Sequence, residues 1–158
     1  MIRTKYYILS LLLITSVSVL SCGGGGDDDP GLTAEEQRLL DLVGTSGSTW
    51  EASSITFDGA PATGFDQFSF TLRGTATSKT YTSIDGDPLF GASGTWGFNA
   101  DNINQLIFDG NDGNVYTLSN LNTAVTPATL RLTVNFTADG GAAFGTDGLY
   151  VLNLQEAQ

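Results

Sequence analysis

The sequence contains no histidine, and this absence removes several classes of enzyme. Histidine is the commonest general base near neutral pH and a member of the Ser-His and Cys-His nucleophile pairs. It is also a frequent ligand of zinc. Any catalysis would have to rest on carboxylates, tyrosine or lysine. We therefore expect a chain that is not an enzyme and that carries no metal ion or cofactor.

Basic residues are scarce, with six Lys and Arg against 17 Asp and Glu and a net charge of −11. Two of the six, Arg3 and Lys5, lie in an N-terminal apolar leader. Without that leader four basic residues face all 17 acidic ones, which makes the net charge −13. Such a surface repels phosphate backbones and anionic lipid headgroups, and no basic cluster offsets it. Nucleic acid is thereby excluded as a partner.

Only one cysteine is present, Cys22, so the fold contains no internal disulfide. It follows a basic start, an apolar stretch over 6–20 and the small residue Ser21, the order typical of bacterial lipoprotein leaders. The apolar stretch is shorter than the ~20 residues of a membrane span. We predict that residues 1–21 are a signal peptide and that Cys22 is lipidated, which anchors the protein in a membrane. The alternative is a free cysteine behind an ordinary signal peptide.

Residues 22–32 are rich in glycine and aspartate and are predicted to be a flexible tether. The run Asp27, Asp28 and Asp29 resembles the export signal by which some Gram-negative bacteria send lipoproteins to the outer face of the outer membrane. The alternative is a solvated spacer. We expect a lipid-anchored protein of the outer membrane; it faces the cell exterior if the acidic run is an export signal, and the periplasmic leaflet is the alternative.

The remaining domain, residues 33–158, is predicted to begin with one short helix. Thr33 and Glu36 have the spacing of a capping box, in which each side chain bonds the other's backbone N–H. Leu39 and neighbouring apolar residues give this helix one buried face. Gly44 is a typical residue for its end.

From residue 49 onward, apolar and polar residues alternate with a period of two, as in half-buried antiparallel strands. Asp-Gly pairs separate the alternating segments and predict hairpin turns. The pattern indicates an all-β domain, a meander that closes into a lipocalin-like barrel, with a two-sheet sandwich as the alternative. Closure requires the first strand to pair with the last, which removes both sheet edges. The predicted strands are 49–58, 66–74, 78–83, 92–99, 103–109, 114–120, 128–138 and 148–155.

Short motifs within the domain carry a family resemblance. Residues 42–44 (LVG) and 48–50 (STW) open the first strand, and a glycine-rich segment, 91–98 (GASGTWGF), lies in mid-chain. Together with the leader and tether, they resemble the lipocalin-like lipoproteins of Gram-negative bacteria over about residues 40–155. The resemblance implies a small β-barrel known by its fold, with no assigned activity.

The aromatic residues on the apolar faces are the main candidates for binding. In an eight-stranded barrel they either fill the interior or line a cavity for one small ligand. A third alternative places Trp and Tyr outside, as a platform for sugars. Tyr81, Tyr116 and Tyr150 would add polar groups to a cavity. The candidate cavity residues are Trp50, Phe68, Phe70, Trp96, Phe98 and Phe108.

The acidic residues fall mainly at predicted turns, where aspartate bonds its own backbone and tolerates left-handed conformations. The segment 109–114 (DGNDGN) is rich in oxygen ligands, and a weak calcium site is the alternative there. We expect a non-catalytic domain that binds a small apolar molecule or a partner protein of the cell envelope. The alternative is a β-sandwich that binds carbohydrate or mediates adhesion at the cell surface. The turn aspartates are Asp58, Asp85, Asp87, Asp101, Asp109, Asp112, Asp139 and Asp147.

Overall fold

The computed structural model describes residues 31–100, 102–138 and 146–158. Cys22 and the Asp27–Asp29 run therefore lie outside the described residues. Within the described part, no helix has the length and apolar character needed to cross a membrane. Leu32–Gln158 forms a compact unit of its own, and its buried core extends from Leu39 to Leu154. Because this segment contains its whole core, it can be produced and studied without the residues before it.

The described residues form one α-helix and nine β-strands. Each of the eight predicted strands has a counterpart, and the extra strand has only two residues, too few to show any alternation. The elements are α1 (Ala34–Val43), β1 (Ser48–Phe57), β2 (Ala60–Pro61), β3 (Ser69–Gly74), β4 (Lys79–Ile84), β5 (Ser93–Asn99), β6 (Asn102–Phe108), β7 (Val115–Asn122), β8 (Thr129–Phe136) and β9 (Gly148–Glu156).

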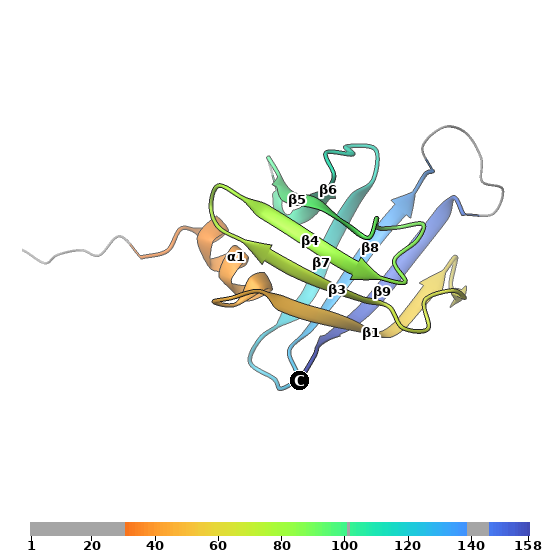
Figure 1. Ribbon diagram of the computed structural model, residues 1–158, viewed down its shortest axis with the longest axis horizontal. Helices are drawn as coiled ribbons and strands as arrows, with labels where there is room; N and C mark the ends of the chain where they lie inside the picture. Colours follow the sequence, from red (N-terminus) through yellow and green to blue (C-terminus); the bar gives the residue numbers. More distant parts are fainter. Residues whose placement is uncertain (1–30, 101, 139–145) are drawn as a thin grey trace, which may run out of the picture. The chain divides into compact units, whose positions relative to one another are not determined.

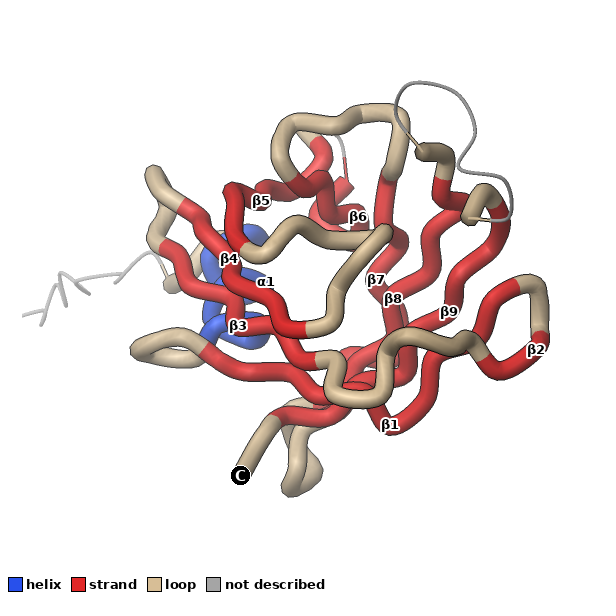
Figure 2. Tube along the Cα trace, turned by 45° about the vertical axis from the view of Figure 1, so that its right-hand side comes forward, coloured by secondary structure: helices blue, strands red, loops and turns tan. Residues whose placement is uncertain are grey.

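The strands form one closed antiparallel barrel, with the short β2 added at its side (Figures 1 and 2). The start of β1 pairs with β3, and most of β1 pairs with β9, from Trp50 opposite Glu156 to Phe57 opposite Tyr150. A bulge between Ala52 and Ser54 bends β1, which pairs with both β3 and β9. The pairing of first and last strands confirms the predicted barrel and excludes the two-sheet sandwich.

Helix α1 packs at one end of the barrel, which we call the helix end. The predicted capping box is present: Thr33 Oγ1 accepts from Glu36 N at 3.2 Å, and Glu36 Oε2 accepts from Thr33 N at 2.8 Å. Gly44 ends the helix with a φ of 57°. Trp50 Nε1 donates to the carbonyl oxygen of Leu42 at 3.1 Å, which satisfies one of the free carbonyls of the last turn. The helix is thus fastened to the start of β1.

The opposite end, which we call the mouth, is where β1, β4, β6 and β8 end and where the described turns after β1, β4 and β6 lie. Aspartates occupy left-handed positions in three of these turns, with φ of 47° at Asp58, 49° at Asp85 and 54° at Asp109. Such positions suit aspartate because its side chain bonds locally to the backbone. The turn interpretation of these three residues is confirmed.

Candidate functional site at the mouth of the barrel

The centre of the barrel is filled by a phenylalanine from a loop rather than from a strand. The segment 85–92, between β4 and β5, crosses the barrel opening (Figure 2), and its Phe90 is buried in the core. Its ring lies 5.5 Å from Phe70, 4.9 Å from Phe108 and 5.1 Å from Tyr116, measured between centroids. Phe68 and Tyr81 complete the ring of aromatic neighbours at 5.7 and 6.2 Å.

The six predicted cavity residues divide into two groups. Phe68, Phe70 and Phe108 surround Phe90 and are buried. The other three lie elsewhere in the barrel. Trp50 donates a hydrogen bond to α1, and Trp96 Nε1 donates to the carbonyl oxygens of Arg73 and Thr80, both at 3.1 Å. Phe98 is half-buried, with the Lys79 ammonium 5.6 Å from the centroid of its ring.

A pocket of about 360 Å³ opens at the mouth beside the Phe90 loop. Its volume lies in the lower part of the range for small-molecule sites. Phe108 is the one predicted cavity residue among the described residues that line this pocket. The lining combines an apolar floor with polar groups: Pro88, Leu89, Gly91, Phe108, Asp109, Asn111, Asn114, Tyr116, Phe136 and Ala138.

Asp109 is the one charged residue in the described pocket lining. Its Oδ2 accepts from Tyr81 Oη at 2.5 Å, and its Oδ1 accepts from the backbone N–H of Thr95 at 2.8 Å. The carboxylate reaches β5 because residue 94 is a glycine, and any Cβ there would overlap Asp109 Oδ1. The side chain is therefore held in one place, with its charge at the edge of the aromatic cluster.

Two tyrosines supply hydroxyl groups close to the pocket. Tyr116 Oη donates to the carbonyl oxygen of Leu89 at 2.7 Å, which ties the loop to β7. Burial raises the pKa of Tyr116, and the nearby Tyr81 and Asp109 raise it further. Burial also raises the pKa of Tyr81, with the bond to Asp109 adding to the shift. Both hydroxyls therefore stay protonated at neutral pH and act as donors.

The remaining polar lining is fixed by the backbone. Asn114 Oδ1 accepts from Thr137 N at 2.8 Å, and its Nδ2 donates to the Thr137 carbonyl at 2.9 Å. In the segment 109–114, Gly113 N donates to Asn111 Oδ1 at 2.9 Å, as in an ordinary turn. Among the described residues, no three side chains of His, Cys, Asp or Glu gather to hold a metal ion.

The sequence pattern does not predict Leu89 and Phe90 as site residues, because alternation identifies buried residues only within strands and these two lie in a loop. The signal available was local: two large apolar residues stand alone between the turn residues 85–88 (DGDP) and Gly91. An apolar pair in an otherwise polar loop usually packs inward, since leaving it exposed forfeits the hydrophobic stabilisation.

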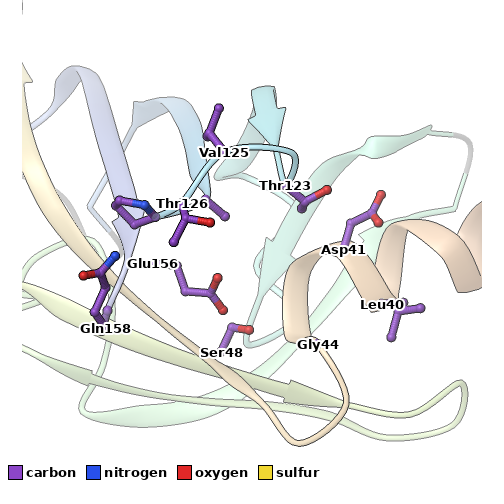
Figure 3. A pocket seen from close by; sticks show the side chains of 12 residues that line it. Leu40, Asp41, Gly44, Ser48, Thr123, Val125, Thr126, Glu156 and Gln158 are labelled. Atoms are coloured by element: carbon purple, nitrogen blue, oxygen red, sulfur yellow. The ribbon is translucent and has the colours of Figure 1, made fainter.

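A second depression, of about 380 Å³, lies at the helix end (Figure 3). Its lining includes Leu40 and Asp41 of α1, Thr123 and Val125 of the loop after β7, and Glu156 of β9. Its large apolar members, Leu40 and Val125, are 40% and 42% exposed, and the buried apolar residue of its described lining is the small Ala128. Because it has no buried aromatic residue in that lining, this depression offers a small molecule less apolar contact than the mouth pocket.

The mouth pocket thus combines aromatic surface, fixed acceptors and one carboxylate, an arrangement suited to holding a small molecule with both apolar and polar parts. A scan against protein-family models gave no match, and neither did searches of the curated proteins and of the solved structures.

Proposed function

We propose that this protein is a non-catalytic, lipid-anchored barrel of the bacterial cell envelope that binds a small amphipathic molecule at its mouth. The observation that carries the proposal is the mouth pocket, whose floor includes Phe108, Tyr116 and Phe136. An apolar floor with a few convergent polar groups is the usual composition of a ligand site.

The lipid anchor and the location at the outer membrane are parts of the same proposal. Cys22 carries the lipid, and Asp27, Asp28 and Asp29 direct the protein to the outer face of the outer membrane. The relation to the lipocalin-like lipoproteins is proposed on the leader, the tether and the motifs at 48–50 and 91–98. A barrel held near a membrane on a flexible tether can take up amphipathic molecules that partition between membrane and water.

Native mass spectrometry of residues 32–158 purified from bacteria, before and after organic extraction, tests the ligand. We expect a discrete additional mass that extraction removes. A bare protein mass, together with no uptake of added amphiphile, would contradict the proposal and direct attention to protein partners.

A further inference from the structure

The charges around the mouth pocket restrict the class of molecule that it can take. We infer that the ligand is an amphiphile with a cationic head group and that anionic amphiphiles such as fatty acids are rejected. This inference rests on the proposed function, because it specifies the ligand of the same pocket.

The pocket contains a fixed negative charge with no basic partner among its described lining residues. Asp109 receives two hydrogen bonds, but both donors, Tyr81 Oη and Thr95 N, are neutral groups. An anionic head group placed here would be repelled by this carboxylate, which no basic group of the described lining offsets. Because Asp109 is an exposed residue, water and salt reduce this repulsion without reversing it. A cationic head group would instead gain a charged partner.

The aromatic lining supplies apolar contact for the chain of an amphiphile. Phe108 and Tyr116 lie in the pocket lining with their rings 4.9 Å apart and nearly perpendicular, at 79°. Both side chains are buried, at 5% and 1% exposure, so the preference for a cation rests on the Asp109 carboxylate rather than on ring faces. A simple metal ion is disfavoured, because it requires several oxygen ligands rather than aromatic carbon.

The basic residues of the described chain lie away from the mouth. Arg38 donates to Asn104 near the start of β6, and Lys79 pairs with Glu35 at 3.5 Å, both at the helix end. Arg73 lies toward the helix end, because the preceding Leu72 pairs with the first residue of β1. Arg131 is the third residue of β8, a strand that begins at the helix end. The segments around the mouth carry only acidic charges among their described residues: Asp58, Asp66, Asp85, Asp87, Asp109, Asp112 and Asp147.

These surrounding aspartates strengthen the preference for a cationic ligand through their electrostatic field, without contacting the ligand. Exposed charges act over about 8–10 Å at physiological ionic strength, so together they concentrate cations at the mouth. We expect the preference for a cationic amphiphile to decrease as the salt concentration rises.

Calorimetric titration of residues 32–158 with three probes of equal chain length tests the inference: octyltrimethylammonium, octyl glucoside and octanoate. We expect the cation to bind at least about tenfold more tightly than octanoate, a difference of ~1.4 kcal/mol, with the glucoside between them. Octanoate binding as tightly as the cation would overturn the inference and leave the proposed function standing. Absence of binding by all three probes would overturn both.

Two variants locate the selection in the pocket. Asp109→Asn should weaken the cation by about tenfold and the glucoside by much less. Gly91→Lys should add a positive charge at the rim and so shift the preference toward octanoate. The fold should accommodate the new side chain, because a Cβ there makes only ordinary contacts, 3.5 Å to Tyr81 Oη. Gly91→Gln is the uncharged control. An unchanged ratio of cation to octanoate affinity in folded Gly91→Lys would contradict the assignment.

Discussion

Phe90 stacks on Phe70 in the centre of the barrel, with ring centroids 5.5 Å apart and ring planes inclined by 9°. Phe70 belongs to β3, whereas Phe90 belongs to the loop between β4 and β5. The loop therefore contributes to the core in the same way as a strand. This contact fixes the floor of the mouth pocket, since the neighbouring Leu89 and Gly91 line that pocket.

Replacing Phe90 by alanine should destabilise the domain by about 3–5 kcal/mol, the usual cost of removing a buried phenylalanine ring. The loss has two parts, the lost burial of the ring and the cavity left among its neighbours. Urea unfolding of residues 32–158, followed by tryptophan fluorescence, measures the change in the free energy of unfolding.

Phe90→Leu should retain much of the stability, because it preserves most of the apolar contact. Leu149→Ala is the exposed control and should change stability by less than about 0.5 kcal/mol, since Leu149 is 43% exposed. A loss below about 1 kcal/mol for Phe90→Ala would show that the loop does not occupy the core in solution.

Two glycines of β5 form a matched pair for testing the position of Asp109. Gly94→Ala should destabilise the domain by about 1–3 kcal/mol, because the new methyl group displaces the Asp109 carboxylate. Gly97→Ala should be tolerated, because a Cβ there meets nothing within 4 Å. Thermal unfolding of both variants gives the comparison. Equal effects would contradict the position assigned to Asp109.

The three tyrosines of the domain should remain protonated at pH values where free tyrosine ionises. The pKa values of Tyr81, Tyr116 and Tyr150 are all raised, with burial as the largest cause. Ultraviolet titration of residues 32–158 should therefore give much less tyrosinate absorbance at pH 10 than the unfolded chain in denaturant, which should be half ionised there.

The same shifts fix the sign of the pH dependence of stability. Above pH 10 the unfolded state loses tyrosine protons that the folded state retains, so the free energy of unfolding falls as the pH rises. The contribution of the three tyrosines to stability is fully present below pH 10, and it is lost as the pH rises toward their raised pKa values in the folded state. Constant stability between pH 9 and pH 12 would contradict the buried positions of these hydroxyls.

Under the proposed function, replacing Cys22 by serine should abolish lipid attachment and leave the leader uncleaved, because the thiol is the group proposed to accept the diacylglycerol. Mass spectrometry of the full-length protein and separation of membrane and soluble fractions measure both effects. If the variant keeps its membrane fraction and its mass differs only by the substitution, Cys22 is not the anchor.

Much of the fold could be predicted because local chemistry and global fold agree in this chain. The capping box of Thr33 and Glu36 is a local interaction, so its spacing alone identified α1. Leu130, Leu132, Val134 and Phe136 alternate along β8 because one face of that strand is buried and the other is exposed. The pairing of β1 with β9 followed from the need to remove the sheet edges.

The site could be predicted only in part, because its main residues lie outside the strands. Phe90 and Leu89 belong to a loop, where no periodicity reveals which residues are buried. Asp109 resembles any other turn aspartate in the sequence, and its bond to Tyr81 depends on the register between β4, β5 and β6. Such contacts join residues far apart in the chain, and a single sequence does not show them.

The most direct test of the central claim is a titration of ¹⁵N-labelled residues 32–158 with octyltrimethylammonium, followed by amide chemical shifts. Binding at the mouth should shift the signals of Leu89, Asp109 and Tyr116 in a saturable manner and leave those of Leu40 and Val125, at the helix end, unchanged. Saturable shifts confined to Leu40 and Val125, or no saturable shift at any residue, would contradict the claim that the mouth is the binding site.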